Sequence, residues 1–123
     1  MLFRSPGARV TDDVERDIAT LWTLAGQFLG RAPRISLAII QHTDCGFERL
    51  IQPAIQAALS QQLGLPVDEV AAMAVADHQA TLRADVDRLS RSPIIPENLI
   101  VSGYLYQVED GLMREMIAPR PLR

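Results

Sequence analysis

The sequence contains no lysine, a single cysteine and no long apolar run. Its twelve basic residues are therefore all arginines, and the absence of lysine excludes Schiff-base chemistry and a P-loop. One cysteine, Cys45, cannot form a disulfide within the chain, which favours a reducing, cytoplasmic location. The apolar runs are shorter than the roughly 20 residues of a membrane span, and the N-terminus lacks the apolar core of a secretory signal. We therefore expect a cytoplasmic protein without a membrane segment.

The length and the net charge of the chain indicate its domain organisation and exclude two classes of partner. The chain has 123 residues, 48% of them hydrophobic, which predicts a single domain over residues 1–123 with one core. The net charge is −3, and the arginines are scattered along the sequence. Because nucleic acids and anionic membranes require a basic stripe, neither is expected as a partner.

The apolar periodicity predicts alternating helices and strands. Helices are expected over 12–29, 47–62 and 67–89, with a kink or break before Pro53. Strands are expected over 35–41, 99–106 and 112–117, the last forming a hairpin edge, followed by a solvated arginine-rich tail. This order is typical of an α/β fold, a mostly parallel sheet flanked by helices with an antiparallel edge hairpin.

A short polar segment, His42-Thr43-Asp44-Cys45-Gly46, directly follows the predicted strand 35–41. Open α/β sheets bind their ligands at the carboxyl ends of strands. An imidazole and a thiolate three residues apart can both turn toward one cation such as Zn²⁺. His42 and Cys45 are therefore the candidate metal ligands. The alternative is structural, with Cys45 a small buried apolar residue and His42 hydrogen-bonded at the strand end.

For three other residues the sequence predicts a structural position only. Trp22 and Phe28 lie at helical spacing and are predicted to be core or interface residues. His78 stands in a polar stretch beside Asp77 and Gln79, which predicts a solvated side chain without a role.

Several segments resemble the β-class carbonic anhydrases. Residues 4–8 resemble that family's Arg-Asn-Ala-Gly-Gly segment, with three of the five positions altered, and residues 10–14 match the start of the helix that follows it. The segment from His42 to Cys45 is similar to the family's second metal motif, His-x-x-Cys. Residues 102–111 look like its last strand and hairpin, so that the resemblance covers most of residues 4–117.

The resemblance implies a lyase that reversibly hydrates CO₂ to bicarbonate. In that family Zn²⁺ is held by two cysteines and one histidine, and His42 and Cys45 map onto two of these ligands. The third ligand comes from a Cys-x-Asp-x-Arg motif on an earlier strand, whose Asp–Arg pair acts on the metal-bound water. A homodimer or a higher oligomer is implied as well.

This sequence lacks the Cys-x-Asp-x-Arg motif. The resemblance therefore implies that one cysteine ligand, the Asp–Arg pair and an N-terminal central strand are missing. The strand 35–41 would then keep a free edge, unless another copy or residues 1–4 cover it. Either the protein starts further upstream, or the chain is a relative that has lost catalysis. Three functions therefore remain open. The chain is a CO₂ hydratase, a non-catalytic subunit or binding module, or a protein that uses the thiol of Cys45 activated by His42.

Overall fold

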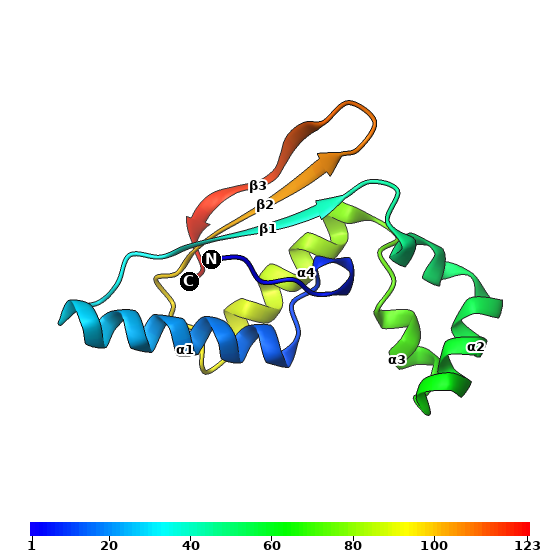
Figure 1. Cartoon of the computed structure of the whole chain (residues 1–123), viewed down its shortest axis with the longest axis horizontal. Helices are drawn as coiled ribbons and strands as arrows, with labels where there is room; N and C mark the ends of the chain where they lie inside the picture. Colours follow the sequence, from blue (N-terminus) through cyan, green and yellow to red (C-terminus); the bar gives the residue numbers. More distant parts are fainter.

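The computed structural model describes all 123 residues, which form a three-stranded sheet with helices packed beside it (Figure 1). The elements in chain order are η1 (Pro6–Ala8), α1 (Asp12–Leu29), β1 (Ser36–His42), η2 (Gly46–Ile51), α2 (Pro53–Leu63), α3 (Val67–Ala72), α4 (His78–Arg91), β2 (Ile100–Gln107) and β3 (Leu112–Pro121). In Figure 1, α1 and α4 lie on the same side of the sheet, and α2 and α3 form a separate arm. No helix is long and apolar enough to cross a membrane.

The sheet has the order β1-β2-β3. β1 and β2 are parallel, from Ser36 opposite Ile100 to His42 opposite Tyr106, and β2 and β3 are antiparallel. The α/β class and the antiparallel edge hairpin are thereby confirmed, although the sheet is mixed rather than mostly parallel. β1 has a neighbour on one side only, and residues 1–4 form no backbone hydrogen bond with it. Pairing of residues 1–4 with this strand is therefore not observed.

Local signals account for the first helix. Thr11 caps α1 by accepting a hydrogen bond from the Val14 N–H, and acidic residues occupy the first turn, where the helix dipole favours negative charge. Gly30 ends the helix in the left-handed conformation, which glycine adopts without a steric penalty. Pro53 likewise begins α2 after a break at Gln52, because proline is accommodated at the first helical position but not inside a helix.

The prediction of one helix over 67–89 is wrong. The structure has two helices, α3 and α4, separated by residues 73–77. Asp77 is extended, and its side chain accepts hydrogen bonds from the N–H groups of Gln79 and Ala80, so that it caps a new helix. Val75 in the connection is 1% exposed, and its N–H donates to the carbonyl of Phe47. Burial of Val75 and the Asp77 cap together favour a break over continuous helix.

The arginine-rich tail was predicted to be frayed and solvated; its arginines are exposed as predicted, but the tail is paired with β2 rather than frayed. β3 continues to Pro121, and Leu122 is buried in the core. The Arg123 guanidinium donates to the carbonyl of Ile95 at 2.6 Å, and the Arg123 N–H donates to the carbonyl of Glu97. The tail is held because its apolar and backbone groups find partners in the loop before β2.

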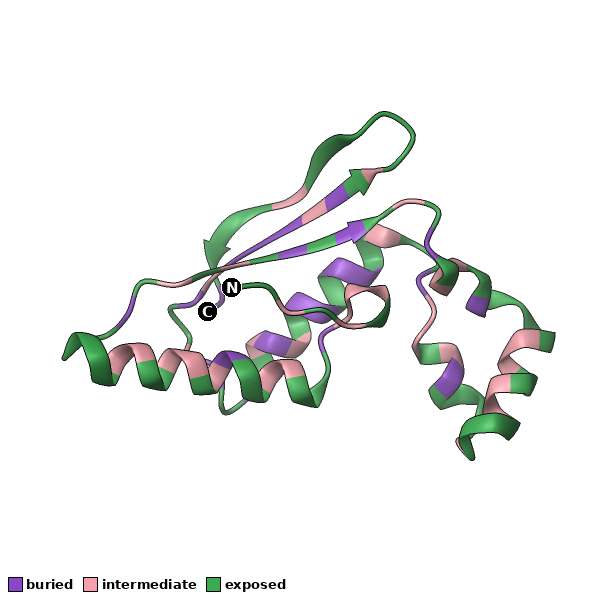
Figure 2. Cartoon of the chain, in the orientation of Figure 1, coloured by how far each residue is buried: buried purple, intermediate pink, exposed green.

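The core lies between the sheet, α1 and α4. Its buried members are Val10, Ile18, Ile39, Leu82, Val86, Leu89, Ile95, Leu99, Val101 and Leu122. Figure 2 shows the buried residues gathered on α4 and the strands that face it, whereas α1 is largely half-buried or exposed. Trp22 packs against this core, whereas Phe28 is 89% exposed, so that Phe28 is not a core residue and only the interface alternative of its prediction remains.

Candidate functional site

His42 is the last residue of β1 and is exposed. Its Nδ1 lies 2.7 Å from the carbonyl oxygen of Thr43. Because a carbonyl oxygen only accepts hydrogen bonds, Nδ1 carries the proton in this contact. The neutral imidazole then presents an unprotonated Nε2, the form in which histidine binds a metal.

Cys45 follows three residues later and is buried. It stands in the N-cap position of η2, and its carbonyl accepts a hydrogen bond from the N–H of Glu48. Between the two candidate ligands the chain turns at Asp44, a non-glycine residue with φ of +53°. Such a conformation is uncommon for residues with a side chain and is tolerated best by Asn and Asp. The left-handed turn at Asp44 thus leads the chain from the strand end to the position of Cys45.

Thr43 fastens this turn to the neighbouring hairpin. Its N–H donates to the carbonyl of Tyr106, and its hydroxyl donates to the carboxylate of Glu109 at 2.9 Å. The same hydroxyl oxygen accepts a hydrogen bond from the N–H of Val108 at 3.0 Å. The segment that carries His42 and Cys45 is therefore held from both its backbone and its side chain.

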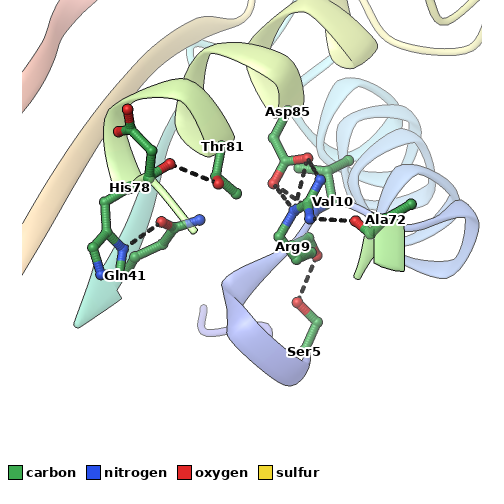
Figure 3. A network of polar contacts seen from close by, with 9 residues as sticks. Ser5, Arg9, Val10, Gln41, Ala72, His78, Thr81 and Asp85 are labelled. Carbon is green, nitrogen blue, oxygen red and sulfur yellow. Dashed lines mark hydrogen bonds and ion pairs between the residues drawn. The ribbon is translucent and has the colours of Figure 1, made fainter. Parts of the chain in front are cut away.

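A polar cluster that the sequence analysis missed lies beside this segment. His78, at the start of α4, has Nδ1 2.9 Å from Gln41 Oε1 and Nε2 2.9 Å from Glu48 Oε1. The His78 side chain is only 16% exposed, so the prediction that it is solvated is wrong. Figure 3 shows the Gln41 side chain reaching from β1 to the ring of His78. The signal for this cluster was Gln41 itself, which follows Leu37 and Ile39 on the core-facing side of the strand.

The cluster has one unsatisfied donor. Gln41 is 2% exposed, and its Nε2 is a buried polar atom without a hydrogen-bond partner. Both contacts of His78 are to acceptor oxygens, which suits an imidazolium that donates from both nitrogens. With a neutral imidazole, reversing the Gln41 amide would let its NH₂ donate to the ring instead. The cluster thus joins β1, η2 and α4 through Gln41 and Glu48, which flank the segment of the candidate ligands in the sequence.

The donors within the chain do not complete a zinc site. No group of three or more His, Cys, Asp and Glu side chains has an arrangement that could hold a metal ion. Catalytic zinc is usually bound by three protein ligands and a water molecule. His42 and Cys45 have the right chemistry, an imidazole and a thiol, but they supply two ligands, and the nearby His78 is engaged with Gln41 and Glu48.

An apolar cavity lies elsewhere in the molecule. It has a volume of about 540 Å³ and runs between α1, the N-terminal residues and β1. Of its 19 lining residues 16 are hydrophobic, and neither His42 nor Cys45 is among them. The cavity is therefore separate from the candidate ligands, although β1 contributes to both.

Comparisons with known proteins give a consistent result. No protein-family model matches the chain. It is 27% identical to carbon disulfide hydrolase from Acidithiobacillus thiooxidans over an alignment of 130 positions, which covers 92% of this chain and 62% of that protein. The carbonic anhydrase of Streptococcus mutans is 31% identical with a TM-score of 0.66 over 90% of this chain and 63% of that one. The carbonic anhydrase of Glaciozyma antarctica is 25% identical with a TM-score of 0.60 over the same shares.

These matches confirm the resemblance to the β-class carbonic anhydrases that the sequence motifs indicate. They also define its extent, because the chain spans 62 to 63% of the length of these relatives. The similarity thus concerns most of this chain but only part of each complete relative.

Proposed function

Since the chain is a distant relative of the β-class carbonic anhydrases, we propose that it carries part of a zinc site for the hydration of CO₂. His42 and Cys45 are two of the ligands, and the third comes from outside these 123 residues. The observation that carries the proposal is the His-x-x-Cys segment at the carboxyl end of β1, in a fold with a TM-score of 0.66 to a carbonic anhydrase.

The contacts around His42 support its role as a ligand. Its Nδ1 donates to the carbonyl of Thr43, and Thr43 is itself tied to β2 and Glu109. Metal-binding histidines usually donate their second ring N–H in this way, which sets the tautomer and holds the ring. A zinc ion bound there would lower the pKa of a bound water molecule.

The number of metal ligands in the chain determines how much CO₂ hydration we expect from it. With two ligands in the chain and no third donor group beside them, we expect these 123 residues alone to bind zinc weakly and not to accelerate CO₂ hydration. The similarity to carbon disulfide hydrolase makes CS₂ a second substrate to assay, since it is a linear molecule of the same shape class as CO₂.

Zinc titration of the purified chain by calorimetry tests this proposal. The unmodified chain should bind about one equivalent of zinc, and His42→Gln and Cys45→Ser should each abolish binding. His78→Gln is the matched control, because it removes the other histidine and should leave zinc binding intact. A chain that binds no zinc, or a Cys45→Ser variant that binds as well as the unmodified chain, contradicts the proposal. Stopped-flow CO₂ hydration above the buffer rate would contradict the expected lack of activity.

The second candidate is a non-catalytic carbonic-anhydrase-like subunit or binding module. The missing third donor favours it. It predicts that a chelator and Cys45→Ser both leave the zinc content at zero and the melting temperature unchanged. The calorimetric titration therefore distinguishes the two candidates directly.

A further inference from the structure

One imidazole contacts both ends of the segment that carries His42 and Cys45. Gln41 precedes that segment and Glu48 lies beyond it, and the ring of His78 is 2.9 Å from an oxygen of each. Figure 3 shows this ring turned toward Gln41. Because the two contacts use different ring nitrogens, Nδ1 and Nε2, the ring links both ends of the segment to α4. We call the side chains of Gln41, Glu48 and His78 the ring clamp.

The ring clamp is largely shielded from water. Gln41 is 2% exposed, and the side chain of His78 is 16% exposed. The Glu48 side chain, at 38%, is the most exposed of the three. Because water has little access to the contact between Gln41 and the ring, a change in one of these groups has to be matched by the other.

The Glu48 carboxylate determines which ring nitrogen keeps its proton. An ionised carboxylate only accepts hydrogen bonds, so Nε2 of His78 donates to it in the charged ring and in the neutral ring alike. The proton that the neutral ring lacks is then the one on Nδ1, which faces Gln41. Loss of this proton turns Nδ1 from a donor into an acceptor.

Gln41 has a donor that matches this change. Its Oε1 faces Nδ1, whereas its Nε2 is buried without a hydrogen-bond partner. A half-turn of the amide exchanges the two groups and directs the unpartnered NH₂ toward the deprotonated Nδ1. The group left without a partner then changes from a donor to an acceptor, and proteins leave buried acceptors unpaired more readily than donors.

The other charged and titratable groups around the ring form no hydrogen bond or ion pair with it. Asp77 accepts from N–H groups at the start of α4, and Asp85 of the same helix is paired with Arg9. Tyr104 and Tyr106 of β2 alternate with the core-facing Leu105 and so lie on the opposite face of the sheet. The charged or titratable groups of the neighbouring elements that are exposed are Arg49 on η2, His42 at the end of β1 and Arg114 on β3.

We propose that His78 is a proton-dependent clamp of the segment between Gln41 and Glu48, in which loss of the Nδ1 proton and reversal of the Gln41 amide occur together. Before this step the imidazolium donates to both side chains; after it the ring donates to Glu48 and accepts from Gln41. Because charged hydrogen bonds are roughly twice as strong as neutral ones, the segment is held more firmly in the charged state. The clamp does not depend on the proposed zinc site and acts in the metal-free chain.

Nuclear magnetic resonance on the ¹⁵N-labelled, metal-free full chain follows both groups at once. Between about pH 5 and about pH 8, the Gln41 side-chain NH₂ signals should shift with the same midpoint as the ring nitrogens of His78. The neutral ring should carry its proton on Nε2. His78→Gln should abolish the pH response of Gln41. His42→Gln is the matched control, because it removes the other histidine, the sequence neighbour of Gln41, and it should leave this response unchanged.

Glu48→Gln tests the second end of the clamp. An amide of nearly the same size can donate or accept, so Nε2 is no longer required to donate, and the neutral ring should populate the Nδ1–H tautomer as well. An unchanged tautomer in this variant would overturn the inference. So would Gln41 signals that stay fixed while the ring titrates, a response that survives His78→Gln, or a ring that keeps one protonation state over the whole range.

Discussion

Asp85 provides the sharpest test of how the N-terminal segment is held to the core. This residue of α4 is 2% exposed, and its carboxylate accepts hydrogen bonds from Arg9 Nε at 3.0 Å, from Arg9 NH2 at 3.2 Å and from the Val10 N–H at 3.2 Å. Arg9 also donates to the carbonyl of Ala72 (Figure 3). The Asp85 carboxylate thus ties the segment between η1 and α1 to α4, and Arg9 extends the link to the end of α3.

Asp85→Ala removes both carboxylate oxygens and leaves Arg9 with the Ala72 carbonyl alone. It leaves the Arg9 side chain, which is 21% exposed, without its counter-ion, and the buried Val10 N–H without a partner. Breaking a buried ion pair from one side costs about 3–5 kcal/mol, whereas replacing both partners costs much less. We expect the lower end of that range, because Arg9 keeps some contact with water.

The expected loss is measurable by thermal and urea denaturation. With 123 residues, 1 kcal/mol corresponds to roughly 4 °C in Tm, so that Asp85→Ala should lower Tm by roughly 12 °C or more. In a double-mutant cycle with Arg9→Met, the pair should show a coupling free energy of about 2 kcal/mol. A loss below about 1 kcal/mol, or additive effects of the two substitutions, would refute the reasoning.

Three further predictions concern single elements. Asp77→Ala should destabilise the chain by about 1 kcal/mol in urea denaturation, because Asp77 caps α4, and Asp77→Asn should retain most of the stability. Gly64→Ala should cost about 1 kcal/mol, since Gly64 ends α2 at φ of +66°; Gly46→Ala, at an open position without a positive φ, should be neutral by the same assay. The side-chain hydrogen bond from Arg88 to Glu15 raises the pKa of Arg88 further above its usual value, so its charge and its bond persist throughout the neutral range. Arg88→Ala should accordingly lower stability by less than about 1 kcal/mol, equally at pH 6 and pH 9, because the pair is partly exposed.

The sequence alone determined the features that depend on neighbouring residues. Thr11, Gly30 and Pro53 act within one helical turn, and each therefore marks a helix end in the structure as its residue type predicts. The apolar run before His42 likewise predicted β1 within one residue at each end. His42 and Cys45 could be named because their spacing is local, although their role as ligands remains a proposal.

Tertiary contacts decided the rest. The break before α4, the order of the tail through Leu122 and Arg123, and the burial of His78 each depend on partners that are distant in sequence. Gln41 and His78 are separated by 37 positions, and the helical periodicity around His78 contains no information on its contact with the buried amide of Gln41. The pairing of β1 with β2 also determined which edge of β1 is unpaired. The sequence of a strand does not specify on which side its neighbour lies.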